Sequence, residues 1–300
     1  MATAQVTVPW TDEAWLQDTH IWIHDVLQQQ GIPVQGPIEQ PHVRPWATVL
    51  RVPTGAGDVY FKAMLPTLAH EPAVTEALAR WRPDCMPRVI AVDTARDWML
   101  VADMGDRLRS HIHNPADLWH WHEVLPLYAD VQIEMAARVA ELLALGIRDW
   151  RLARLPALYS DLLTDRDALL VGQADGLTHG EYERLQALLP WFEAACAQLA
   201  TFRIPETIDH NDFHDGNIFI QDGRYTFGDW GDSCLTHPFF SMLIPPRSTA
   251  YRLKLADDAP ALIEMCEIYL AAWAAYGSPA RLRAALAQAR PLAMFNRALN

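Results

Sequence analysis

The chain has 300 residues, of which 51% are hydrophobic and 20% are charged, and this composition excludes a disordered or fibrous protein. Its formal net charge of -13 argues against a nucleic-acid partner, which requires clustered Lys and Arg side chains. The apolar runs are far shorter than the roughly 20 residues that span a bilayer, and the N-terminal MATAQVTVPW has no signal-peptide pattern, so we expect a cytoplasmic protein with no membrane partner.

Four cysteines are scattered along the chain without any CxxC spacing: Cys85, Cys196, Cys234 and Cys266. This pattern favours reduced, buried thiols over a disulfide framework or a zinc site. The oligomeric state is left open by the sequence.

Short elements dominate the first third of the chain. A helix is expected from Thr11-Asp12-Glu13, where polar and acidic residues suit a helix start, to Gly31. Two strand pairs and one helix follow, over residues 47–52 and 58–64, 66–83, and 88–92 and 98–102. These elements predict a small antiparallel sheet with one internal helix.

The pattern becomes helical after Gly105. Residues 118–145 form a long apolar-periodic segment that we expect to restart at Pro126, because proline suits a first helical turn and breaks a helix interior. Further helices are predicted over residues 156–171, 180–201 with an interruption near Pro190, 259–276 and 279–299. The fold class is therefore α+β, with a small β-rich lobe over residues 1–104 and a larger, mostly helical lobe over residues 105–300.

A polar hairpin interrupts the helical part. Asp222-Gly223 between two runs of β-branched and apolar residues is a strong signal for a two-residue turn, because both positions require a positive φ. Counting back along this ladder places Asn217 opposite Gly228 and beside Asp229. Cross-strand neighbours lie about 5 to 8 Å apart, so an amide oxygen and a carboxylate at this end could share Mg²⁺.

The same segment carries a motif that spans the preceding loop. His210 to Asn217 fits H-x-D-x-x-x-x-N with Asp212 as its acid, and Asp229-Trp-Gly231 follows after the hairpin. With this order of elements the chain resembles the aminoglycoside phosphotransferase and choline kinase family, small-molecule relatives of the protein kinases. The resemblance covers nearly the whole chain and implies a bilobal, protein-kinase-like fold with a nucleotide-binding N-terminal lobe.

The resemblance implies a role for each matching residue. Asp212 would accept the proton of a substrate hydroxyl as catalytic base, while Asn217 and Asp229 would hold Mg²⁺ against the phosphates of ATP. Lys62, on the strand where the family keeps its phosphate-binding lysine, would reach the α and β phosphates. Glu71 would hold Lys62 in place, although Glu76 competes for this role.

A linker between the lobes completes the nucleotide site by resemblance. The carbonyl of Ala102 and the N–H of Met104 would hydrogen-bond the adenine edge, and the choice between ATP and GTP is left open. The chain departs from the family at two places. The turn at residues 43–46 is not glycine-rich, and Thr236-His237-Pro238 stands where the family usually shows Gly-Asp-Pro followed by a further Asp.

The acceptor is expected to be a hydroxylated small molecule. Four acidic residues in the later helices would suit a cationic alcohol such as an aminoglycoside, or they would form the solvated face of a helix: Asp257, Asp258, Glu264 and Glu267.

Two other functions remain open from the sequence. The first is a metal-dependent hydrolase in which His210, Asp212, His214 and His237 bind zinc. The second is a catalytically inactive relative that binds nucleotide. The zinc site leaves Lys62, Asn217 and Asp229 without a role, and the departures near His237 are the only support for an inactive relative.

Overall fold

The structure is a computed structural model that describes residues 8–299. Residues 1–7 and Asn300 lie outside this range. The expected lack of a signal peptide concerns the first of these residues and therefore also lies outside the described part of the chain. Contacts divide the chain into two compact units. Unit 1 takes the residues up to Leu108 together with Asn217–Gly231, and unit 2 takes Arg109–Gly216 together with the residues from Asp232 onward.

An antiparallel five-stranded sheet forms the centre of unit 1, in the order β1-β2-β3-β5-β4. Its strands alternate apolar and polar residues, so that Leu50, Phe61 and Leu100 lie in register on one face and Lys62 faces the other side. The strand bounds are β1 (Glu39–Val43), β2 (Ala47–Val52), β3 (Val59–Met64), β4 (Val89–Asp93) and β5 (Trp98–Ala102). The predicted antiparallel sheet is confirmed.

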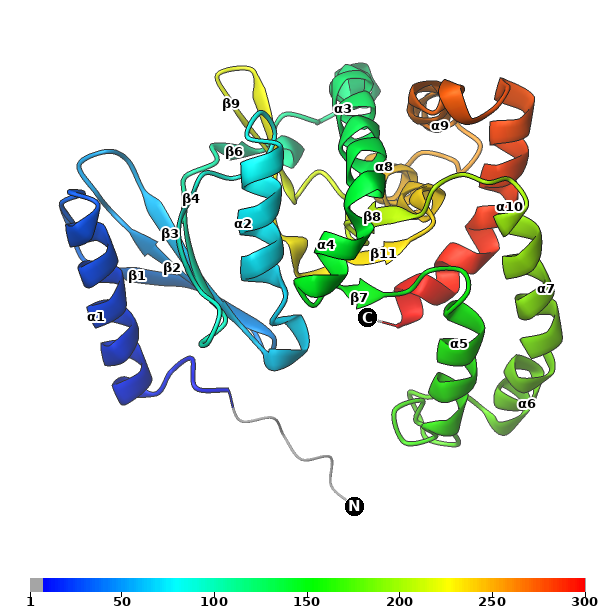
Figure 1. Ribbon diagram of the computed structural model, residues 1–300, viewed down its shortest axis with the longest axis horizontal. Coiled ribbons are helices and arrows are strands. Elements are labelled where there is room, and N and C mark those ends of the chain that lie inside the picture. Colours follow the sequence, from blue (N-terminus) through cyan, green and yellow to red (C-terminus); the bar gives the residue numbers. More distant parts are fainter. Residues whose placement is uncertain (1–7, 300) are drawn as a thin grey trace. The chain divides into compact units, whose positions relative to one another are not determined.

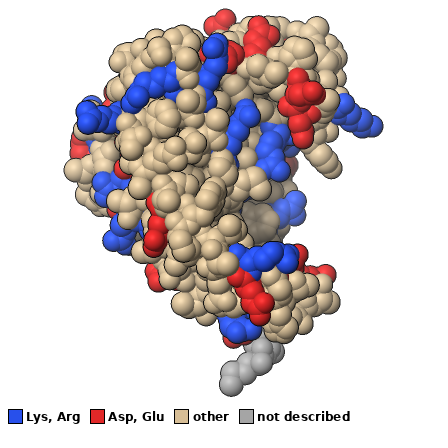
Figure 2. Space-filling view, turned by 90° about the vertical axis from the view of Figure 1, so that its right-hand side faces the viewer, with Lys and Arg blue, Asp and Glu red and all other residues tan. Residues whose placement is uncertain are grey.

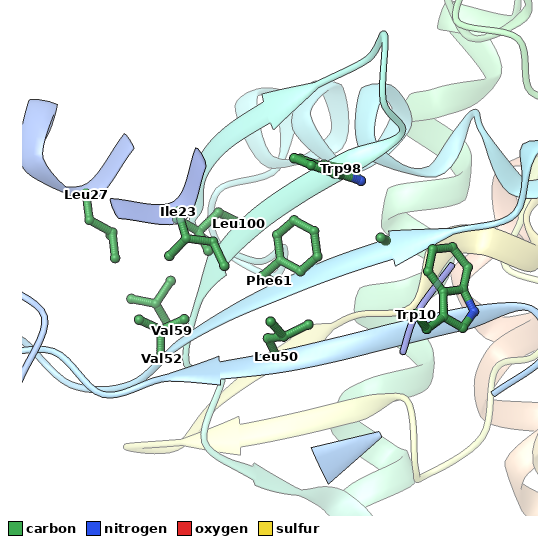
Figure 3. Close-up of a cluster of buried hydrophobic side chains, with 10 residues drawn as sticks. Trp10, Ile23, Leu27, Leu50, Val52, Val59, Phe61, Trp98 and Leu100 are labelled. Atoms are coloured by element: carbon green, nitrogen blue, oxygen red, sulfur yellow. The ribbon is translucent and has the colours of Figure 1, made fainter. Parts of the chain in front are cut away.

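Two helices lie on opposite faces of this sheet, α1 (Glu13–Gln29) and α2 (Glu71–Trp81) (Figure 1). The cap of α1 is Asp12, whose side chain accepts a hydrogen bond from the N–H of Trp15 at 2.9 Å. Apolar side chains of α1, including Ile23 and Leu27, pack on strand residues around Phe61 (Figure 3). A 3₁₀ turn, η1 (Pro66–Leu68), precedes α2 and brings its first residue to the opposite face.

The predicted hairpin belongs to unit 1. It consists of β9 (Ile218–Gln221) and β10 (Arg224–Phe227), and β9 also pairs with β6 (Asp106–Arg107). Asp222 and Gly223 have φ values of +52° and +78°, as a tight hairpin turn requires. The guanidinium of Arg224 donates to three carbonyl oxygens in residues 83–86 at 2.8 to 2.9 Å.

These contacts explain why the hairpin joins the first unit, whereas the sequence-based division at residue 104 placed it in the second lobe. The first crossing between the units falls at Leu108 and Arg109.

Unit 2 is mostly helical. Its main helices are α3 (Trp119–Met135), α4 (Val139–Ala144), α5 (Leu155–Thr164), α6 (His179–Ala187), α7 (Leu189–Ala200), α8 (Ile244–Leu253), α9 (Pro260–Ala272) and α10 (Pro279–Ala298). The expected restart at Pro126 is wrong, because α3 continues through this residue and breaks only at the 3₁₀ turn η4 (Ala136–Arg138). Buried side chains after Pro126, among them Tyr128 and Gln132, anchor the following turns in the core.

Unit 2 contains a small sheet that was not predicted from the sequence. It contains β7 (Arg148–Asp149), β11 (Cys234–Thr236) and β8 (Thr207–Asp209), in that order. Strands of two or three residues carry too short an alternation to be recognised. The strands β8 and β11 flank the chain segment with the predicted catalytic motif.

All four cysteines are free and buried, as expected. Within residues 8–299, no helix combines the length and the apolar character that crossing a membrane would need.

The core of unit 1 gives a first prediction. Phe61 is fully buried between α1 and the sheet, and removing a buried phenylalanine ring costs about 3–5 kcal/mol. We expect Phe61→Ala to lower the free energy of urea unfolding by this amount. The control is Tyr251→Ala, since that ring is 88% exposed, and its effect should stay within about 0.5 kcal/mol. Equal effects of the two substitutions would contradict the assigned packing.

Candidate active site

A lysine held between two carboxylates is the central feature of unit 1. Lys62 projects from the face of β3 opposite the α1 core, and its Nζ lies 2.7 Å from Oε1 of Glu71 and 2.5 Å from Oδ1 of Asp229. Glu71 is the first residue of α2 and is fully buried, whereas the side chain of Asp229 is 54% exposed. Glu71, and not Glu76, is therefore the partner of the lysine.

Burial and charge act on this lysine in opposite directions. Desolvation favours the neutral amine and lowers the pKa of Lys62, but the negative charges of Asp229 and Glu71 outweigh this effect and raise the pKa above its ordinary value. Lys62 therefore stays protonated across the whole physiological pH range. A fixed ammonium group of this kind can bind phosphate oxygens.

The chain around Asp229 is closely packed within unit 1. Asp229 has a φ of +65°, and a Cβ atom added to the nearby Gly231 would lie only 2.8 Å from Oε2 of Glu71. Only glycine leaves room for the buried carboxylate at this position. In the Asp-Trp-Gly sequence, Asp229 thus lies beside Lys62, and Gly231 lies against the carboxylate of Glu71.

The hairpin and the linker also meet in unit 1. The carbonyl oxygen of Asn217 accepts a hydrogen bond from the N–H of Gly228 at 3.0 Å, which confirms the predicted register. A Cβ atom added to Gly228 would lie 3.2 Å from the sulfur of Met104, two residues after Ala102 at the end of β5. The predicted adenine linker therefore adjoins the end of the hairpin that precedes Asp229.

The oxygen donors at this end of the hairpin suit a hard cation. Mg²⁺ is bound by carboxylate and amide oxygens and retains several water ligands. Asp229 offers a carboxylate that is accessible to solvent, and Asn217 is brought to the adjacent strand end by the ladder. The residues present fit a magnesium ion.

In unit 2, the predicted base Asp212 follows β8 on a tight loop. Its Oδ1 lies 3.1 Å from Nη2 of Arg297, and its Oδ2 lies 3.5 Å from Nε2 of His214. The N–H of Gly216 donates to Nδ1 of His214 at 3.0 Å, so the neutral imidazole carries its proton on Nε2, facing Asp212. Burial lowers the pKa of His214, and the nearby charge of Asp212 opposes this shift only in part.

A buried polar network supports the start of this loop. Oδ1 of Asp209 accepts hydrogen bonds from the hydroxyl of Ser241 at 2.6 Å and from that of Tyr128 at 3.3 Å. Gln132 donates to Ser241 and accepts from Tyr269. Burial raises the pKa of Asp209. The hydroxyl of Tyr128 also accepts from the backbone N–H of His210 at 2.9 Å, so His210 lies within the framework of the loop.

Besides Arg297, two further arginines that the sequence analysis did not single out contact the same loop. The buried Asp215 pairs with Arg109, at 3.3 Å, and with Arg252. A Cβ atom at Gly216 would collide with the Arg109 guanidinium, which explains the glycine in the motif. The sequence offered no periodic or motif signal for Arg109, Arg252 or Arg297, because their partners are distant in the chain.

The zinc alternative finds no support. Among residues 8–299, no group of three or more His, Cys, Asp or Glu side chains is placed to hold a metal ion. His237, one of the supposed ligands, is instead buried and accepts a hydrogen bond from the N–H of Phe239 at 3.2 Å, capping the 3₁₀ helix η6 (Pro238–Leu243). The departure at Thr236-His237-Pro238 thus replaces the family sequence by a structural cap.

This geometry is of the protein-kinase-like class, with a lysine on a small sheet paired to a glutamate at the start of a helix, and with a polar loop followed by a hairpin. A family model described as "Phosphotransferase enzyme family" matches residues 66–284. The chain therefore belongs to this family and is a small-molecule phosphotransferase, a kinase. The resemblance, the fold class and the enzyme class indicated by the sequence are confirmed. No curated protein matches the chain.

Solved structures of similar fold include three with different names. A putative aminoglycoside phosphotransferase from Ralstonia eutropha has a TM-score of 0.59 at 14% identity, with 94% of this chain and 97% of that chain covered. An ethanolamine kinase from Plasmodium vivax has a TM-score of 0.57 at 12% identity, with 93% and 80% covered. A macrolide 2'-phosphotransferase from Brachybacterium faecium has a TM-score of 0.56 at 16% identity, with 91% and 88% covered. At these identities the likeness shows the fold alone.

His237 generates a prediction on pH dependence. Burial lowers its pKa to about 3, so the folded protein excludes a proton that the unfolded chain binds below about pH 6.5. The stability that depends on the neutral ring is present above pH 6.5 and is lost as the pH falls toward 3, by up to about 1.4 kcal/mol per pH unit. We expect His237→Asn, which retains a capping oxygen, to show a shallower loss of unfolding free energy over this range.

The control for this measurement is His24→Asn, which removes an exposed histidine from α1. Its pH profile of urea unfolding should parallel that of the wild type. If the His237 and His24 variants changed the slope equally, the buried neutral state of His237 would be contradicted.

Proposed function

We propose that the protein transfers the γ-phosphate of ATP to a hydroxyl group of a small molecule, with Mg²⁺ as cofactor and Asp212 as the catalytic base. The observation that carries the proposal is the Lys62 cluster, in which a protonated lysine is fixed by Glu71 and by the acid of Asp-Trp-Gly. Phosphoryl transfer requires little covalent chemistry from the protein and depends on placing positive charge against phosphate oxygens. A fixed lysine beside an exposed carboxylate suits this task.

The unit 1 residues divide the work of binding the nucleotide. Lys62 donates to the α and β phosphates, whose charge competes with Asp229 for the ammonium group, and Glu71 keeps the lysine in place. Asn217 and Asp229 would hold the magnesium ion, which would neutralise charge on the phosphates. The carbonyl of Ala102 and the N–H of Met104 bind the adenine edge.

Asp212 acts on the acceptor. As the acceptor oxygen forms its bond to the γ phosphorus, the proton of the hydroxyl passes to the Asp212 carboxylate. The bond between the γ phosphorus and the bridging oxygen breaks, and its electron pair leaves with ADP. His214 and Arg297, which contact the two carboxylate oxygens, keep the group oriented.

The acceptor class is proposed only as a hydroxylated small molecule. Three relatives of similar fold carry the names of aminoglycoside, macrolide and ethanolamine phosphotransferases or kinases. The expected acidic acceptor site is weakened by the pairing of Glu267 with Arg283 at 2.7 Å. Figure 2 shows Lys and Arg side chains interspersed with Asp and Glu on the face drawn, rather than one acidic field. A screen of aminoglycosides and neutral alcohols for stimulated ADP release is the direct test of substrate class.

Asp229 provides the test of cofactor binding. We expect Asp229→Ala to abolish the magnesium-dependent part of the thermal stabilisation by ATP, because the variant lacks the exposed carboxylate that would hold the ion. The measurement compares melting temperatures with ATP in the presence of Mg²⁺ and of EDTA. Asp257→Ala removes an exposed carboxylate between α8 and α9 and should respond to Mg-ATP as the wild type does. Retained magnesium dependence in Asp229→Ala would contradict the role assigned to this residue.

Asp212 provides the test of chemistry. Asp212→Asn keeps the size of the side chain but removes its proton-accepting carboxylate, and general-base catalysis contributes about 10²–10⁴-fold to a rate. We expect ADP release from Mg-ATP to fall by a factor in this range, while the Kd for Mg-ATP stays within about twofold of the wild type. Wild-type turnover in the Asn variant would exclude Asp212 as the base, and a wild type without any magnesium-dependent ADP release would exclude the kinase activity.

A further inference from the structure

The last turn of α10 contacts the loop that carries Asp212, and both belong to unit 2. Nη1 of Arg297 donates to the carbonyl oxygen of Asn211 at 3.0 Å and lies 3.3 Å from Oδ2 of Asp232. Nη2 of the same guanidinium lies 3.1 Å from Oδ1 of Asp212. One arginine thus joins the residue before the proposed base, the base itself and the acid that follows Asp-Trp-Gly.

The preceding helix residue reinforces this contact. Asn296 is buried, and its Nδ2 donates to Oδ1 of Asn211 at 3.1 Å. Asn211 has a φ of +59°, a left-handed conformation that is uncommon outside glycine, although asparagine adopts it more often than most residues. Two consecutive side chains of α10 therefore hold the left-handed residue directly before Asp212, with one contact to its side chain and one to its carbonyl oxygen.

A basic residue at the end of a helix has a simple structural explanation, since the helix dipole favours positive charge there. That explanation requires no particular orientation of the side chain. Arg283, on the same helix, shows the ordinary case, because it pairs with Glu267 and its side chain is 57% exposed. The Arg297 guanidinium turns instead toward the loop and contacts two oxygen atoms on it, from Asn211 and Asp212, and a third oxygen atom on Asp232. A planar group with fixed donors is suited to bridge such a set.

We infer that Arg297 is a positioning residue for Asp212 and that the end of α10 thereby forms part of the catalytic apparatus. The inference rests on the proposed function, in which Asp212 is the base. Arg297 lies 3.1 Å from Oδ1 of Asp212, while Oδ2 lies 3.5 Å from Nε2 of His214. Loss of the arginine leaves the carboxylate free to rotate and the left-handed residue before it less restrained.

The experiment measures ADP release from Mg-ATP, with water as the acceptor, and the Kd for Mg-ATP in the same variants. A displacement of about 1 Å at a reacting group can lower a rate by up to about 10²-fold. We expect Arg297→Met to lower kcat by about 10- to 100-fold and to leave the Kd within about twofold, since the proposed nucleotide-binding residues lie in unit 1. Arg297→Lys keeps the charge without the planar fork and should give an intermediate rate.

A double-mutant cycle separates positioning from a general structural role. If Arg297 acts through Asp212, the substitution Arg297→Met should have little further effect in the Asp212→Asn background, because the group that it positions is already inactive. An equal loss of rate in both backgrounds would overturn the inference.

Arg283→Met is the matched control, since it removes an arginine and an ion pair from the same helix. Its kcat should equal that of the wild type, and equal rates in the two methionine variants would overturn the inference. If Arg297→Met does not fold, as judged by its melting temperature, the kcat of Arg297→Lys is compared with that of Arg283→Lys. Equal values for these two lysine variants would then overturn the inference.

The wild type and Asp212→Asn distinguish the two proposals. An active wild type, an impaired Asp212→Asn and a normal Arg297→Met would reject the positioning role alone. A wild type that releases no ADP would reject the proposed function and, with it, the role of Arg297.

Discussion

The pairing of one lysine with two carboxylates constrains the whole of unit 1. A largely buried ammonium group is tolerated only where opposite charges replace its hydration, and Lys62 obtains them from Glu71 and Asp229. The first lies at the start of a helix and the second after a hairpin more than 150 residues further along the chain. Strand, helix and hairpin must therefore all be formed before the charge is satisfied, and in the proposed function the same arrangement presents the ammonium group to the phosphates.

In unit 2, the corresponding constraint is the orientation of the partly exposed Asp212 carboxylate on its loop. Buried side-chain hydroxyls donate hydrogen bonds to Asp209 and so hold the start of this loop in place. Asn296 and Arg297, at the end of α10, contact the loop residues Asn211 and Asp212. Rigid supports of this kind are what a catalytic carboxylate requires, because its effect depends on small displacements.

Much of this architecture could be predicted because its signals are local. The Asp222-Gly223 turn gave the hairpin register, and the apolar and polar residues that alternate along β3 are a local pattern of the same kind. The continuous helix through Pro126 could not be predicted, since it depends on tertiary anchoring that outweighs local preference. Arg297 could not be found for the same reason, because the only local property of the residue is its place at the end of a helix. The roles of Asp212, Asn217 and the adenine linker stay predictions.

The buried thiols have a practical consequence. Burial raises the pKa of Cys85 and of Cys196 to about 12, and those of Cys234 and Cys266 are raised as well, so none of the four presents a reactive thiolate at neutral pH. A single cysteine introduced on the surface would therefore be alkylated selectively without removal of the native ones. A fluorophore or spin label could therefore be placed at the exposed hairpin tip in an otherwise unaltered chain.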